Sequence, residues 1–172
     1  MDENKKSLVK EITQYALIIV LVVLIRVFIF TPIKVEQHSM YPTLNPKDVM
    51  ILNKITLRVN EINRFDIVVA KLNKEHIIKR VIGLPGEHIE FKDNKLFVNN
   101  EYVEDFDLNT YTDDFKLEDI NEYEIPENQY FLLGDNRENS TDSRIFGLIE
   151  KKDILGKANL VLFPFKNFGI VK

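Results

Sequence analysis

The chain contains four serines and no cysteine, so a serine hydroxyl is the first candidate for a catalytic nucleophile. Such a hydroxyl reacts poorly near neutral pH unless a base lies beside it. Ser39 stands in a polar, turn-rich segment just after a long apolar run, Ser140 and Ser143 share a second such segment, and Ser7 precedes the apolar run. His38 adjoins Ser39, but adjacent residues of an extended chain point to opposite faces. We therefore expect His38 not to be the base.

A lysine within residues 77–86 is a second chemically interesting group. The segment reads Ile-Ile-Lys-Arg-Val-Ile-Gly-Leu-Pro-Gly, and strand alternation places Lys79 and Arg80 on opposite faces. If the Lys79 face is buried, loss of hydration disfavours its ammonium form and lowers its pKa. A downward shift of about three units from about 10.4 would leave roughly half of the amine neutral near pH 7.4, at a cost of about 4 kcal/mol. The pattern equally allows the reverse, with Arg80 buried and Lys79 at an exposed edge.

Residues 134–144 form a third polar segment, which reads Gly-Asp-Asn-Arg-Glu-Asn-Ser-Thr-Asp-Ser-Arg and follows an apolar strand pattern. Asp142 and Arg144 could form an ion pair that holds this loop rigid. The Ser140 hydroxyl could accept a hydrogen bond from a lysine amine and orient it. The alternative is a capped surface loop with a single salt bridge.

Composition excludes several other kinds of site. With no cysteine, disulfides, thiolate metal sites and thiol nucleophiles are excluded. The three histidines lack metal-ligand spacing, and no calcium-loop motif occurs, so we expect no metal and no other cofactor. There are 23 lysines and arginines against 27 acidic residues, a net charge of −4. That balance argues against a nucleic-acid partner, which usually requires a basic face.

The chemical segments follow an apolar run that predicts one transmembrane helix over residues 12–30, with Arg26 as its only charged residue. Nineteen helical residues measure about 28 Å, close to the hydrocarbon thickness of about 30 Å. Lysines in residues 1–11 favour a cytoplasmic N-terminus. A buried core helix is the alternative. A cleaved leader is another, but no small-x-small site follows the run. Residues 31–172 are then expected on the outer face of the membrane.

The remainder of the chain predicts a mainly β fold. Short β-branched runs occupy residues 49–52, 66–70, 77–82, 130–133 and 159–163, and residues 88–98 read as a hairpin that turns at Asp93 and Asn94. Residues 87–127 hold 14 acidic residues against three lysines. We interpret this stretch as a solvated lobe inserted between core strands.

Together, the segments resemble the bacterial type I signal peptidases. The nucleophile box of that family reads Ser-Met-x-Pro-Thr-Leu, which residues 39–44 match, and Gly-Asp-Asn-Arg-x-x-Ser-x-Asp-Ser-Arg is matched in full by residues 134–144. Residues 64–69 and 79–86 resemble two further boxes, and the resemblance runs from about Arg26 to Gly156. It implies a fold of two antiparallel sheets behind one N-terminal transmembrane helix, with a variable insert at about 87–127.

The resemblance also implies roles for individual residues. Ser39 would be the nucleophile and Lys79 the general base of a Ser–Lys dyad. Ser140 would bond the lysine amine, and Asp142 and Arg144 would form the supporting ion pair.

Three positions depart from the family pattern. Phe65 and Glu87 stand where glycine and aspartate are common. Gln37 stands two residues before the nucleophile, where some members use a serine hydroxyl to stabilise the oxyanion. We hypothesise that the Gln37 amide takes this role, or that the Ser39 backbone N–H acts with less help.

The implied activity is removal of signal peptides from secretory preproteins, after an Ala-x-Ala-like site, by a single-pass enzyme of the bacterial cytoplasmic membrane. Its partners would be preproteins, membrane lipid and a nearby Sec translocon. A catalytically inactive, membrane-anchored preprotein-binding paralogue is the alternative. Intact Ser39 and Lys79 argue against it. A soluble self-cleaving repressor of the same Ser–Lys group is disfavoured by the anchor, and a Ser–His enzyme would carry histidine at position 79.

Overall fold

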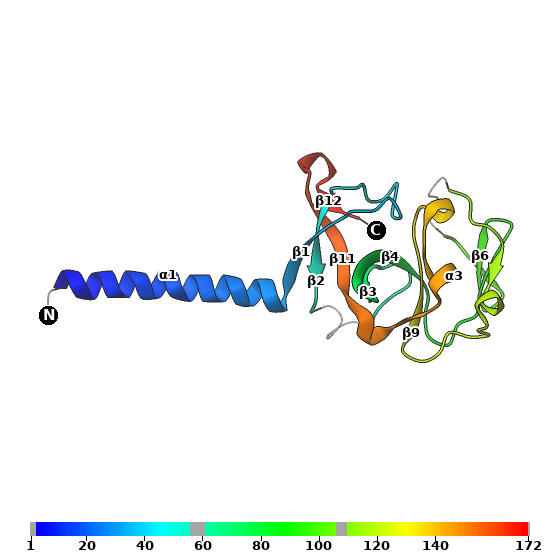
Figure 1. Cartoon of the computed structure of the whole chain (residues 1–172), viewed down its shortest axis with the longest axis horizontal. Coiled ribbons are helices and arrows are strands. Elements are labelled where there is room, and N and C mark those ends of the chain that lie inside the picture. Colours follow the sequence, from blue (N-terminus) through cyan, green and yellow to red (C-terminus); the bar gives the residue numbers. More distant parts are fainter. Residues whose placement is uncertain (1–2, 56–60, 106–109, 172) are drawn as a thin grey trace.

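The computed structural model describes residues 3–55, 61–105 and 110–171. Residues 1–2 of the predicted cytoplasmic N-terminus and residues 106–109 of the predicted insert lie outside this part of the chain. Within it, one long helix precedes a domain built from two antiparallel sheets (Figure 1). The predicted fold class is confirmed.

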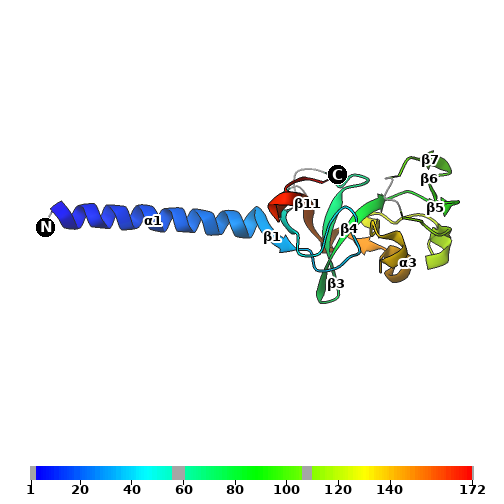
Figure 2. The same cartoon turned by 90° about the horizontal axis from the view of Figure 1, so that it is seen from above.

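The N-terminal helix α1 spans Glu3–Phe28 and projects from the domain without folding back on it (Figures 1 and 2). Its segment Ser7–Phe28 is long and apolar enough to cross a membrane and is not buried in the protein. At about 1.5 Å per residue these 22 residues measure about 33 Å. The helix ends two residues before the predicted end of the span because Phe30 already belongs to the first strand.

The larger sheet has the strand order β1-β2-β11-β3-β4-β9-β10, and β12 pairs with β11. Its strands are β1 (Phe30–Lys34), β2 (Val49–Asn53), β3 (Ile67–Leu72), β4 (Glu75–Gly83), β9 (Gln129–Leu133), β10 (Ile149–Glu150), β11 (Ile154–Phe163) and β12 (Gly169–Ile170). Strands β3 and β4 lie in the middle and carry apolar side chains on both faces. Two separate clusters of buried residues, one around Val69 and one around Val68, therefore cover opposite faces of the sheet.

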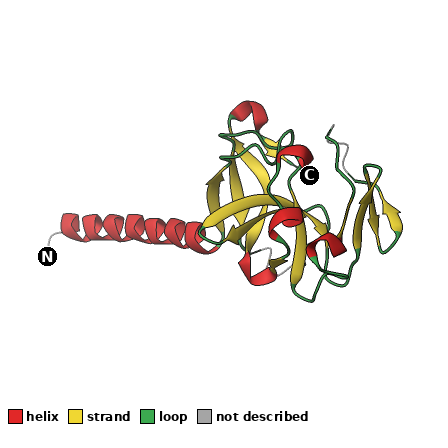
Figure 3. Cartoon of the chain, turned by 45° about the vertical axis from the view of Figure 1, so that its right-hand side comes forward, coloured by secondary structure: helices red, strands yellow, loops and turns green. Residues whose placement is uncertain are grey.

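The smaller sheet has the order β7-β6-β5-β8 and lies at the end of the domain far from α1 (Figure 3). Its strands are β5 (Ile89–Lys92), β6 (Lys95–Val98), β7 (Glu101–Val103) and β8 (Phe115–Lys116). Asp93 and Asn94 both have positive φ, as a tight hairpin turn requires. A buried cluster joins this sheet to the larger one, because Phe131 of β9 stacks on Phe115.

Short helical turns complete the fold: η1 (Leu117–Ile120), η2 (Arg137–Asn139), α3 (Ser143–Phe146), η3 (Lys151–Asp153) and η4 (Phe165–Asn167). The apolar runs predicted as strands form β2, β3, β4, β9 and part of β11, except that Asp66 precedes β3. Strands β1, β7, β8, β10 and β12 were not predicted, since four of them have only two or three residues and β1 continues the apolar pattern of the helix.

Candidate active site

Ser39 lies in a turn that follows β1 and is held by buried neighbours. The Tyr41 amide donates to the His38 carbonyl (3.0 Å) and the Leu44 amide to the Met40 carbonyl (2.8 Å). Met40 and Leu44 are buried in the core under the β1–β2 side of the larger sheet. Ser39 itself is half-buried. Its buried neighbours hold the backbone of the turn, while its side chain stays accessible.

Lys79 lies in the central strand β4, and its side chain is only 1 % exposed. Its amine donates to the Ser140 hydroxyl over 2.9 Å. The pKa of Lys79 is lowered from its ordinary 10.5 to about 8, chiefly by burial; Asp142 opposes this shift, Arg144 adds to it, and Asp135 opposes it. A lysine in this state is neutral in about one tenth of molecules at pH 7, against less than about one in a thousand for an ordinary lysine, and a neutral amine can accept a proton.

Arg80, the next residue of the strand, is also fully buried. Its guanidinium donates to both carboxylate oxygens of Asp135 (2.8 and 2.6 Å) and to the Phe65 carbonyl (2.9 Å). The sequence pattern offered a choice between burying Lys79 and burying Arg80. The structure buries both because β4 is covered on both faces.

The loop after β9 carries Ser140 to the lysine and is braced by an ion pair. Arg144 donates from Nε and Nη2 to the two oxygens of Asp142 (2.9 Å each), and the same Nη2 also donates to the Arg137 carbonyl (2.6 Å). Asp142 also accepts from the Gly134 amide (3.1 Å), which closes the loop on itself. These charge-assisted bonds are the strong kind, so the loop is rigid.

Gly134 is the point where the separate segments meet. A Cβ at this position would overlap the Ser140 hydroxyl and the Ser39 carbonyl, so only glycine fits. The Asn136 amide donates to the same Ser39 carbonyl (3.0 Å), and its side chain donates to the His38 carbonyl (3.3 Å). The nucleophile segment and the Ser140 loop are therefore bonded directly to each other.

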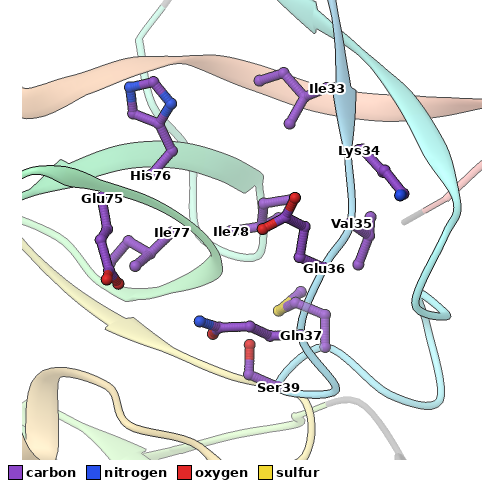
Figure 4. Close-up of a pocket in the computed structure, with 11 residues that line it drawn as sticks. Ile33, Lys34, Val35, Glu36, Gln37, Ser39, Glu75, His76, Ile77 and Ile78 are labelled. Atoms are coloured by element: carbon purple, nitrogen blue, oxygen red, sulfur yellow. The ribbon is translucent and has the colours of Figure 1, made fainter.

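A cleft of about 430 Å³ opens beside Ser39, between the end of β1 and the start of β4 (Figure 4). Ile33, Val35, Met40, Ile77 and Ile78 supply apolar lining, and Lys34, Glu36, Glu75 and His76 supply charged or polar lining. Figure 4 shows the Gln37 and Ser39 side chains directed into the same space. An extended peptide could lie between the two strands with its carbonyl at Ser39.

The remaining candidates from the sequence lie elsewhere or serve structure. His38 is exposed. Ser143 is buried, and its hydroxyl accepts from the Leu132 amide (2.9 Å). Among the described residues, no group of three or more His, Asp or Glu side chains could hold a metal ion. Sequence reasoning missed the Arg80–Asp135 pair and the contacts of Asn136. Arg80 lies in the segment 77–86, and Asp135 and Asn136 lie in the segment 134–144, so all three residues stood in segments already singled out.

Two of the three departures from the family pattern, Phe65 and Glu87, have a local explanation. Phe65 has a φ of +71°, in the left-handed region where a residue with a Cβ is disfavoured by about 1–2 kcal/mol. This explains why the resemblance leads to the expectation of glycine there; the Phe65 ring packs against the core cluster of the smaller sheet. Glu87 accepts from the Leu84 amide (2.8 Å) and from Arg64 (2.9 Å), contacts that need only a carboxylate.

Comparison with known proteins gives a consistent result. Residues 8–163 match the family model described as signal peptidase, peptidase S26. Signal peptidase I S of Bacillus subtilis (strain 168) is 38 % identical over 94 % of this chain and 92 % of its own length. Signal peptidase I of Bacillus caldolyticus is 40 % identical over 84 % of this chain and 86 % of its own. A crystal structure of a signal peptidase I from Enterococcus faecalis V583 superposes with a TM-score of 0.53 at 34 % identity, covering 58 % of this chain and 97 % of that one.

Proposed function

This chain belongs to the signal peptidase S26 family and is a signal peptidase I, a serine endopeptidase that cleaves signal peptides from preproteins, and from that premise we propose that Ser39 and Lys79 form its catalytic Ser–Lys dyad. The observation that carries the proposal is the buried amine of Lys79, with its lowered pKa and its bond to Ser140. A general base must be deprotonated and held in one direction; burial favours the first condition, and the bond to Ser140 supports the second.

In the proposed reaction, neutral Lys79 takes the Ser39 proton while the serine oxygen bonds to the scissile carbonyl carbon. The carbonyl oxygen becomes an oxyanion. The C–N bond then breaks, Lys79 gives its proton to the leaving amine, and the mature protein departs with a new N-terminus. Water, deprotonated by the same lysine, attacks the acyl-enzyme; the bond between the acyl carbon and the Ser39 oxygen breaks, Lys79 returns the proton to that oxygen, and the signal peptide leaves with a free carboxylate. Ser140 keeps the amine directed at the reacting atoms, and the Asp142–Arg144 pair holds Ser140 in place.

We assign Gln37 as an oxyanion donor together with the Ser39 backbone N–H, on the basis of its direction into the cleft beside Ser39 (Figure 4). Gln37→Ala is then expected to lower kcat by about 10²–10³-fold, the usual cost of one such donor. The measurement is single-turnover cleavage of a preprotein. Glu36→Ala is the matched control, since Glu36 lines the same cleft without a side-chain N–H. A Gln37→Ala rate within about twofold of the wild type would contradict the assignment.

The cleft supports a preference for an Ala-x-Ala-like sequence. Apolar side chains from β4, from the end of β1 and from the chain after β1 line it. Small substrate side chains would fit against this lining in an extended conformation, and larger ones would collide with it. Secretory preproteins arriving from a nearby Sec translocon are the substrates that carry such a sequence.

We further propose that α1 is a membrane anchor, with residues 1–11 cytoplasmic, residues 12–30 spanning, and residues 31–172 outside as the catalytic domain. Membrane lipid is then a second partner. Four apolar side chains of the hairpin formed by β11, η4 and β12 are more than half exposed: Phe163, Phe165, Phe168 and Ile170. This hairpin lies at the end of the domain from which α1 emerges, whereas the acidic smaller sheet lies at the opposite end (Figures 1 and 2). A bilayer around α1 would meet the aromatic hairpin first.

The test is cleavage of an Ala-x-Ala preprotein by the full chain in liposomes, with the products identified by mass. We expect the wild type and Ser7→Ala to cut after the site and Ser39→Ala to leave the preprotein intact. Cleavage that persists in Ser39→Ala would overturn the dyad. A folded wild type that binds several preproteins but cuts none would favour the inactive binding paralogue.

A further inference from the structure

The junction between the helix and the domain contains no flexible linker. Helix α1 ends at Phe28 and β1 begins at Phe30, so Ile29 alone separates them. The Ile29 amide still donates to the Ile25 carbonyl (2.9 Å), as in a helix, and its carbonyl accepts from the Lys54 amide (3.0 Å), as in a sheet. Both backbone groups of the connecting residue are therefore engaged.

Side chains from the sheet also close the end of the helix. The last carbonyls of a helix have no partner within it. Here the Thr31 hydroxyl donates to the Arg26 carbonyl (3.1 Å), and the Lys54 amine donates to the Val27 carbonyl (3.1 Å). A cation at this end is also favoured by the helix dipole. Lys54 directly follows β2, so the bond ties the helix to a second strand.

The same rigid path continues to the nucleophile. Strands β1 and β2 pair without a shift from Phe30 opposite Asn53 to Lys34 opposite Val49. Beyond β1, the Val35 amide donates to the Asp48 carbonyl and its carbonyl accepts from Lys47 (2.8 Å each). The five residues of β1 cover about 17 Å at roughly 3.3 Å each. Ser39 thus stands at a set height above the end of α1.

We infer that this junction is a ruler: by fixing the height of Ser39 above the bilayer, Thr31 and Lys54 determine how many residues a substrate must have between its apolar segment and the cleavage site. The inference rests on the proposed function. Substrate and enzyme share one bilayer surface, and the cleft lies beside the chain that rises from α1 to Ser39. A short spacer cannot reach the cleft, whereas a long one must order additional residues when it binds.

The experiment compares preproteins whose spacer lengths run from about three to about eleven residues, a span of roughly 10–36 Å when extended. The enzymes are the wild type, Thr31→Val with Lys54→Met, and a form with four Gly/Ser residues inserted between Ile29 and Phe30. Lys95→Met, which changes an exposed lysine of the smaller sheet, is the control. A soluble peptide that contains the cleavage site but no apolar segment reports the chemistry alone.

We expect the wild type and Lys95→Met to share one sharp optimum in spacer length. The insertion should shift or broaden this optimum, with rates at poor lengths rising about tenfold relative to the best substrate. The double variant should broaden it, and soluble-peptide cleavage should stay within about twofold throughout. Identical length profiles in all forms, with the soluble peptide cleaved normally, would overturn the inference. A wild type that cannot cleave the soluble peptide or any preprotein would overturn the proposed function, and this inference with it.

Discussion

Replacement of Lys79 by arginine is expected to lower kcat/KM for preprotein cleavage by about 10²–10⁴-fold, the usual contribution of a general base. Arginine keeps the positive charge and much of the length of lysine, but its guanidinium does not lose a proton in the physiological range. Lys79→Met should have the same effect, because it removes the basic atom while keeping an apolar stem in the buried site.

The measurement is initial-rate kinetics on one preprotein in liposomes, with Lys71→Arg as the matched control because Lys71 is an exposed lysine of the adjacent strand β3. The control should retain wild-type activity. Circular dichroism of each variant separates loss of chemistry from loss of fold. An active and folded Lys79→Arg enzyme would exclude Lys79 as the base.

The same residue predicts the pH profile of the wild type. The base acts when deprotonated, so activity should rise with pH through the Lys79 pKa of about 8 and level off above it. Between pH 7 and pH 9 the neutral fraction grows from about one tenth to about nine tenths, so kcat/KM should rise about tenfold. A profile that is flat over this range would mean that another group accepts the proton.

Replacement of Asp135 by alanine is expected to destabilise the fold by about 3–5 kcal/mol, because it removes the carboxylate that neutralises the buried guanidinium of Arg80. Both side chains of the pair are inaccessible to solvent and are joined by two hydrogen bonds. Replacing both partners together, as in Arg80→Met with Asp135→Leu, should cost less than the single change, since neither charge of the pair then remains buried.

The free energy of unfolding is measured by urea titration of the detergent-solubilised chain. The signal is tyrosine fluorescence, because the chain contains no tryptophan. Glu150→Gln is the control, because Glu150 and Lys152 form an exposed pair whose loss should leave the transition unchanged. If Asp135→Ala unfolds within about 1 kcal/mol of the wild type, the pair does not hold β4 against the loop after β9.

Local patterns sufficed to predict the helix and most long strands. Apolar periodicity located β2, β3 and β4, and the turn preference of Asp93 and Asn94 located the first hairpin of the smaller sheet. These features depend on neighbours in sequence. The sequence did not allow strand β1 to be distinguished from the helix. Its apolar residues continue the apolar run of the helix, and its partner strand β2 lies some twenty residues further along the chain.

The site was predicted as a set of residues but not as an arrangement. The polar segments and their resemblance pointed to Ser39, Lys79 and Ser140. The pattern and the resemblance could not decide whether Lys79 or Arg80 is buried. Burial at these positions depends on residues from distant parts of the chain that cover both faces of β4. The demand for glycine at position 134 has the same origin, because the atoms that exclude a Cβ come from Ser39 and Ser140.

The buried amine of Lys79 also couples folding to proton uptake. Between its native pKa of about 8 and the higher value that it regains in the unfolded chain, Lys79 is neutral when folded and charged when unfolded. Unfolding in this range binds a proton, so this residue makes the native state more stable as the pH rises, and it contributes no further change below about pH 8. The protonation state that the fold accommodates best is therefore the one that the proposed dyad requires. For this residue, conditions that activate the enzyme also stabilise it.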